Sequence, residues 1–121
     1  MKRNMMTQGE LRKYYKCRAA LRSTEETLAG LRAYAEASGE DLEWDIAELE
    51  ASAKRQAEAL ANRETEVLST LGAVEDASVR AYLRLHYHKG MQWKEIAAMF
   101  GKTEKSICCI SYEAVKKCIP K

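Results

Sequence analysis

The residues best suited to chemistry lie between Lys94 and Tyr112, and their chemistry is hydrogen bonding and charge neutralisation. Lysine neutralises phosphate groups, whereas hydroxyl side chains can bond phosphate oxygens or the edges of nucleobases. The candidate contact residues are Lys94, Lys102, Thr103, Glu104, Lys105, Ser106, Cys108, Cys109 and Tyr112. We expect Lys105 and Ser106 to contact base edges or phosphate, and Lys94 and Lys102 to contact phosphates. Tyr112 can bond a phosphate or pack against a neighbouring side chain.

Two predicted helices around a tight turn must position these residues. Gly101 is expected to end the first helix, because this position favours a residue that accepts a positive φ, and Thr103 can cap the second. The predicted buried residues are Trp93, Ile96, Ala97, Phe100, Ile107, Ile110, Ala114 and Val115. A preceding helix starts near Asp76 or Ser78 and ends at Gly90, with Val79, Tyr82, Leu83, His86 and Tyr87 on its buried face. The pattern predicts a three-helix unit of helix-turn-helix type. The last helix of this unit, which Thr103 caps, is the one that most often occupies the major groove of DNA.

The N-terminal part of the chain predicts two long helices. Thr7 and Glu10 have capping-box spacing, and Ser38-Gly39 separates a first helix from a second over residues 40–71. The apolar stripes comprise Tyr14, Cys17, Leu21, Leu28, Leu31 and Ala35, then Leu42, Ile46, Leu49, Ala53, Ala57, Leu60, Val67 and Leu71. The short break predicts an antiparallel, coiled-coil-like hairpin. We therefore expect an all-α protein with a helical hairpin over residues 1–73 and a DNA-binding unit over residues 74–121.

Charge is divided unevenly along the chain. Residues 1–39 hold eight Lys/Arg against four Glu, residues 40–75 three against ten Asp/Glu, and residues 76–121 nine against four. The basic C-terminal third coincides with the predicted DNA-binding unit, as phosphate binding requires. The acidic middle is unsuited to a DNA surface, but it complements the basic first helix.

The sequence offers little support for an enzyme or a metalloprotein. Cys17, Cys108, Cys109 and Cys118 do not form a zinc motif with the two histidines, and we expect reduced thiols. For His86 and His88 we expect one packed and one exposed ring. The carboxylates between Glu40 and Glu50 suit a solvated helix face, so neither a catalytic site nor a cofactor is predicted. The absence of an apolar span or signal peptide predicts a cytoplasmic protein that does not enter membranes.

The segment LRLHYHKGMQWKEIAAMFGKTEKSICCISYEAVKKC, residues 83–118, resembles region four of bacterial sigma factors. In that family the region is a helix-turn-helix that contacts the −35 promoter element. The whole chain is similar to small sigma-like regulators encoded by phages and prophages. The resemblance implies a sequence-selective transcriptional regulator whose recognition helix starts at Thr103 and enters the major groove of double-stranded DNA. The N-terminal helices would then bind a second copy of the chain or RNA polymerase.

Two other functions remain open. One is a phage DNA-packaging protein of the small-terminase type, which also joins a helix-turn-helix to coiled-coil helices, usually in the opposite order. The other is an interaction protein that does not bind DNA and contacts RNA polymerase or a sigma factor. Glu104, Cys108 and Cys109 motivate the second alternative, because arginine and glutamine are common at these positions in the family.

Overall fold

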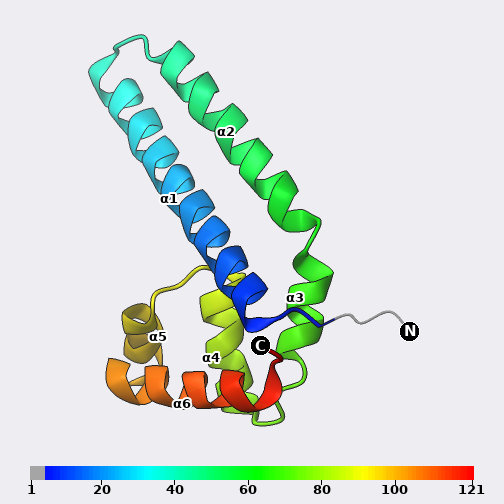
Figure 1. Ribbon diagram of the computed structural model, residues 1–121. Helices are drawn as coiled ribbons and strands as arrows, with labels where there is room; N and C mark the ends of the chain where they lie inside the picture. The colour runs from blue at the N-terminus through cyan, green and yellow to red at the C-terminus, as the bar shows by residue number, and fades with distance from the viewer. Residues whose placement is uncertain (1–4) are drawn as a thin grey trace.

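The computed structural model describes residues 5–121, and this part of the chain is all-helical, as predicted (Figure 1). It consists of six α-helices and one π-helical turn: α1 (Gln8–Ser38), α2 (Glu43–Ala61), α3 (Glu64–Leu71), α4 (Ala77–Leu83), η1 (Arg84–His88), α5 (Trp93–Phe100) and α6 (Glu104–Cys118). Within residues 5–121, no helix is both long enough and apolar enough to cross a bilayer.

The two longest helices, α1 and α2, pack along each other in opposite directions (Figure 1). α1 begins with the predicted capping box, in which the Thr7 hydroxyl accepts the Glu10 N–H and the Glu10 carboxylate accepts the Thr7 N–H. The shared apolar surface is thin, since Leu60 is the one buried residue of α2. Cys17 and Ala57 were predicted to belong to it, but both are exposed.

The predicted second helix over residues 40–71 was wrong in two respects, because α2 starts at Glu43 rather than at residue 40 and because the chain bends at Asn62-Arg63. The Arg63 N–H bonds the Leu60 carbonyl at 3.0 Å, and α3 then starts at Glu64. The apolar spacing continues through Leu60 and Val67, so periodicity alone did not reveal the bend. Its consequence is that α3 turns away from the line of α2 and packs against η1.

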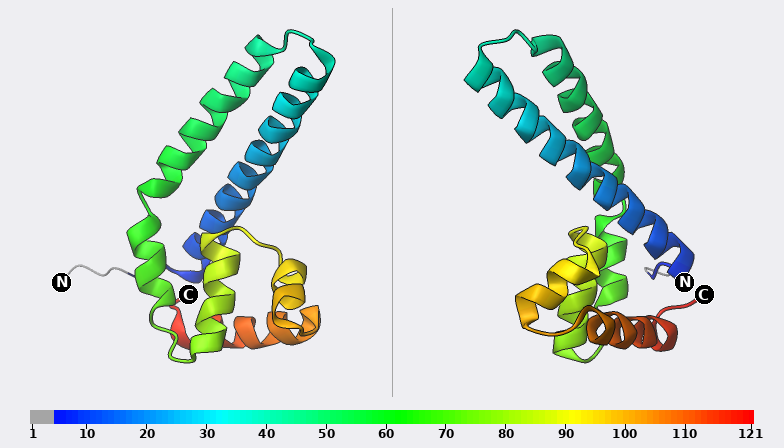
Figure 2. Two further views of the ribbon diagram at one scale, coloured as in Figure 1. Left: turned by 180° about the vertical axis from the view of Figure 1, so that it is seen from behind. Right: turned by 90° about the vertical axis from the view of Figure 1, so that its left-hand side faces the viewer.

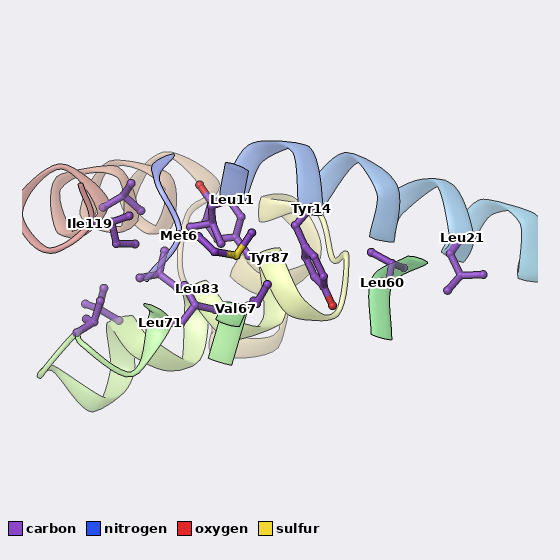
Figure 3. Packing of buried hydrophobic residues seen from close by; sticks show 13 residues of the cluster. Met6, Leu11, Tyr14, Leu21, Leu60, Val67, Leu71, Leu83, Tyr87 and Ile119 are labelled. Atoms are coloured by element: carbon purple, nitrogen blue, oxygen red, sulfur yellow. The ribbon is translucent and has the colours of Figure 1, made fainter. Parts of the chain in front are cut away.

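One buried cluster joins the two parts of the chain that were predicted as separate units (Figure 3). Its buried members are Met6, Leu11, Tyr14, Leu21, Leu60, Val67, Leu71, Val74, Val79, Leu83, Tyr87, Val115 and Ile119. Two long-range hydrogen bonds accompany it: the Met6 N–H donates to Thr70 Oγ1 at 2.7 Å, and Gln8 Nε2 donates to the Ile119 carbonyl at 2.9 Å. Residues on both sides of the boundary expected at residue 73 therefore share one hydrophobic core.

The helix predicted from Asp76 to Gly90 forms, but it contains a π-helical turn. Asp76 caps α4 by accepting the Val79 N–H, and further along the Lys89 N–H bonds the Arg84 carbonyl five residues back. The predicted inward residues Val79, Tyr82, Leu83, His86 and Tyr87 are all buried. The wider π turn allows the consecutive residues His86 and Tyr87 both to face the interior.

Candidate nucleic-acid interface

The turn between α5 and α6 is formed by the residues that the sequence predicted. Gly101 has a φ of 66°, and the Lys102 N–H bonds the Ala97 carbonyl at 2.9 Å while the Gly101 N–H bonds the Ala98 carbonyl at 3.4 Å. This pair of bonds is a Schellman motif, which satisfies the carbonyls at the end of α5. The Thr103 hydroxyl then accepts the Ser106 N–H at 3.2 Å and caps α6. The predictions for Gly101 and Thr103 are confirmed.

The buried face of α6 differs from the prediction. Ile107, Ser111 and Val115 are buried, whereas Ile110 is 48% exposed and Ala114 is partly buried. Because successive helical residues are about 100° apart, the direction midway between residues 107 and 115 coincides with Ser111 rather than with Ile110. Phe100, also predicted to be buried, is 39% exposed, although its ring meets the ring of Tyr82 edge-on at 4.9 Å.

Most of the predicted contact residues are exposed. The exposed ones are Lys94, Lys102, Thr103, Glu104, Lys105, Ser106, Cys109 and Tyr112, and Cys108 is partly buried. Lys105, Cys109 and Tyr112 share the outward side of α6 with Lys116, at the spacing i, i+4, i+7, i+11. We call these four residues the α6 stripe. Glu104 and Cys108 lie on the adjoining side, and Lys94 stands apart at the start of α5.

The α6 stripe extends along the whole of α6, and α6 lies at the end of the molecule opposite the α1–α2 tip (Figure 2). Its position depends on contacts of α6 with α4 and α5. Lys116 was not among the predicted contact residues, because a lysine near a helix C-terminus is equally well explained by the helix dipole. Its alignment with Lys105 and Tyr112 is visible from helical spacing, so this signal was present in the sequence.

A stack of aromatic and imidazole rings packs against Tyr112 of α6. Trp93 packs on His86 with ring centres 3.8 Å apart, and His86 packs on Tyr15 of α1 at 4.0 Å. Tyr112 meets Trp93 edge-on at 6.0 Å, although 49% of Tyr112 is exposed. Trp93 therefore has the structural position that the sequence predicted. Tyr112 packs against a neighbour and still presents part of its ring to solvent.

The two histidines occupy different environments. His86 is buried, its Nδ1 lies 2.8 Å from the Met91 carbonyl, and burial lowers the pKa of its ring to about 4. At neutral pH the ring is uncharged, so Nδ1–H donates to this carbonyl. His88 was expected to be exposed, but only 12% of its side chain is accessible. Its Nε2 lies 3.0 Å from a carboxylate oxygen of Glu64, which accounts for the difference.

The described residues do not suggest a metal centre. Over residues 5–121, no three His, Cys, Asp or Glu side chains are grouped as metal ligands would be. All four cysteines are free thiols: Cys17, Cys108, Cys109 and Cys118. What the arrangement offers chemically is a set of donors and positive charges on the outward side of one capped helix.

Comparison of the chain with models of known protein families, with curated proteins and with solved structures gives no match.

Proposed function

We propose that this protein is a sequence-selective DNA-binding regulator, with α6 as the helix that enters the major groove. The observation that carries the proposal is the α6 stripe, which stays exposed along the helix while Ile107, Ser111 and Val115 hold the opposite side in the core. A helix held in this way has its outward side free for a groove wide enough to accept an α-helix.

The charges around α6 support the same function. Lys105 and Lys116 lie on the stripe, and Lys102 lies in the turn just before the helix. The N-terminus of α6 adds the positive end of a helix dipole, which favours phosphate. Lys94 lies at the N-terminal end of α5, where it would contact a phosphate beside the groove. Lys94, Lys102 and Lys116 would position the protein on the duplex by contacting phosphates. Lys105 and Ser106 would contact base edges.

In this proposal α4 with η1, α5 and α6 form a helix-turn-helix similar to region four of sigma factors. The protein would be a transcriptional regulator of the phage and prophage kind. The helical hairpin formed by α1 and α2 would bind RNA polymerase or a second copy of the chain. Near its tip, Tyr34 and Trp44 are 54% and 73% exposed, and such a partner would cover them.

The deciding experiment is binding to mixed-sequence duplex DNA over a range of salt concentrations. We expect log K to fall linearly with log salt, with a slope of about −0.9 for each phosphate that is neutralised. Site selection from a random library would then identify the preferred sequence. A flat response, or no binding at low salt, would overturn the proposal.

A second function is favoured by one feature of the surface. Met99, Phe100 and Ile110 are large apolar residues that are 61%, 39% and 48% exposed. Apolar side chains in such positions are more typical of protein contacts than of DNA contacts. If the salt experiment fails, an interaction protein that contacts RNA polymerase or a sigma factor through this end becomes the better explanation.

A further inference from the structure

We propose that the first turns of α1 belong to the same DNA-binding surface as α6, and that Arg12 and Lys16 contact the phosphate backbone beside the groove that α6 occupies. We call these two residues the α1 basic edge. This inference rests on the proposed function, because it requires a duplex on the α6 stripe. It assigns a DNA-contacting role to the base of the long hairpin, outside the helix-turn-helix.

The start of α1 is hydrogen-bonded to the residues that directly follow α6. The Gln8 N–H donates to the Pro120 carbonyl at 2.8 Å, and Gln8 Nε2 donates to the Ile119 carbonyl at 2.9 Å. Arg12 lies one helical turn after Gln8, and Lys16 lies two turns after it. The α1 basic edge is therefore held close to α6.

Both residues of the basic edge border the same hollow as the α6 stripe. This hollow has a volume of about 300 Å³, and Arg12 and Lys16 line it together with Tyr112 of the stripe. Its remaining lining residues are Tyr15, His86, Tyr87 and Trp93. None of these described lining residues is acidic. The hollow between α1 and α6 is therefore lined by two positive charges from α1 and otherwise by aromatic and imidazole rings.

The charges of the basic edge are available to an external anion. In the described part of the chain, neither Arg12 nor Lys16 belongs to an ion pair, and both are exposed. The nearby carboxylate of Glu10 is engaged elsewhere, with the Thr7 N–H at 2.9 Å and with Arg63 at 3.2 Å. Two unpaired cations next to Tyr112 are therefore available to neutralise phosphates of a duplex.

The same helix also shows where the contact must end. Beyond Lys16 the basic residues of α1 are engaged within the protein: Arg18 donates to the Tyr14 hydroxyl, Arg22 pairs with Glu95, and Arg32 pairs with Glu50. Glu25, Glu26 and Glu36 follow along α1, and the acidic α2 lies beside it. A duplex on α6 would therefore touch the base of the hairpin while the hairpin tip remains clear of DNA.

The test compares two double variants that remove the same charges. R12Q/K16Q neutralises the basic edge, and K54Q/R55Q neutralises one lysine and one arginine on the exposed surface of α2. We expect R12Q/K16Q to weaken binding to a mixed-sequence duplex on the order of tenfold to a hundredfold at about 0.1 M salt, and to reduce the salt slope by about 1.8. K54Q/R55Q should bind as the unmodified protein does. Thermal unfolding checks that both variants fold.

The outcomes separate this inference from the function on which it rests. If R12Q/K16Q binds like the unmodified protein while K105Q binds more weakly, the basic edge is refuted and the role of α6 stands. Equal weakening by both double variants would also refute it, because net charge alone would then explain the loss. If the unmodified protein does not bind duplex DNA, both ideas fail together.

Discussion

Arg22 of α1 clamps Glu95 of α5 through two parallel hydrogen bonds, with Nη1–Oε1 at 2.6 Å and Nη2–Oε2 at 2.5 Å. Arg22 Nη1 also donates to the Gly90 carbonyl at 3.2 Å, and Glu95 Oε1 accepts the Gln92 N–H at 2.9 Å. The pair joins residues that are 73 positions apart. It therefore links the first turn of α5, and with it the helices that we propose for DNA, to α1 of the hairpin.

We expect Glu95→Gln to lower the free energy of unfolding by about 1 kcal/mol, a modest value because both side chains are about one third exposed and water screens them. Hydrogen bonding to Arg22 lowers the pKa of Glu95 to about 2. The contribution is present above the ordinary pKa of 4.5 and is lost as the pH falls towards 2. Urea unfolding of the variant measures it.

Two further variants test the geometry of this pair. Arg22→Lys should lose nearly as much stability, because an ammonium cannot reproduce the two parallel bonds. Glu26→Gln removes the other carboxylate near Arg22, at 3.4 Å and 70% exposed, and should change stability little. Similar losses for Glu26→Gln and Glu95→Gln would show that the clamp has no special role.

His86 should make the stability of the fold sensitive to acid. Its ring has a pKa of about 4 in the folded protein against 6.5 ordinarily, so the unfolded chain binds more protons between these values. Stability should therefore fall as the pH drops from about 7 to about 4, by up to about 3 kcal/mol from this group. His86→Phe keeps a ring between Tyr15 and Trp93 but removes the titration. Urea unfolding across this pH range should show a flatter profile for the variant, and parallel profiles would contradict the prediction.

Gly90 and Gly30 should respond in opposite ways to replacement by alanine. Gly90 has a φ of 76°, and a Cβ there would lie 2.9 Å from Arg18 Cγ and 3.3 Å from the Arg18 backbone carbonyl. Gly90→Ala should cost roughly 2–4 kcal/mol, from backbone strain and from pushing α1 away. In Gly30→Ala the new methyl has no atom within 4 Å, and a helix interior gains roughly 0.5–1 kcal/mol from this change. The melting temperatures of the two variants should shift in opposite directions. Two shifts of the same sign would contradict this expectation.

Two adjacent lysines on α6 lie in different surroundings. Lys116 belongs to the α6 stripe, whereas Lys117 borders a different hollow, beside Glu113 and Asp76. Lys116→Gln should weaken binding to mixed-sequence duplex and reduce the salt slope by about 0.9, because one phosphate contact is lost. Lys117→Gln removes the same charge and should leave both quantities unchanged. Equal effects would mean that the stripe does not define the DNA-facing side.

Base contacts and phosphate contacts should respond differently to substitution. With a selected DNA site, Lys105→Ala and Ser106→Ala should reduce the preference for that site over mixed sequence. Lys102→Ala, in the turn, should weaken both kinds of DNA about equally. Competition binding at fixed salt measures the ratio of the affinity for the selected site to the affinity for mixed sequence. An unchanged ratio in all three variants would argue against direct base contacts by α6.

Local signals in the sequence predicted local structure well. The Thr7 box, the turn at Gly101 and the Thr103 cap each involve groups within a few residues of one another, so residue type and spacing nearly determine them. The all-helical class followed from apolar periodicity in the same way. These features required no knowledge of what each helix packs against.

The features that depend on distant partners were not predictable in this way. The bend at Arg63 contains neither glycine nor proline, and Arg63 is bonded to Glu10 of α1, a partner that periodicity does not reveal. The choice between Ile110 and Ser111 as the buried residue depends on the direction from which α4 and α5 approach α6. Arg12 and Lys16 were visible as basic residues, but only the packing of α1 on η1 and α6 brings them beside Tyr112.

The hydrogen bonds of Gln8 also constrain the order in which contacts form while the chain is synthesised. Gln8 leaves the ribosome early, but the Ile119 carbonyl that it binds follows 111 residues later. α1 can coil as soon as it emerges, since the backbone hydrogen bonds of a helix are local, whereas its base reaches the Ile119 carbonyl only after α6 has emerged. The surface that we assign to DNA thus forms only after α6 has emerged, and a nascent chain that still lacks α6 does not have this surface.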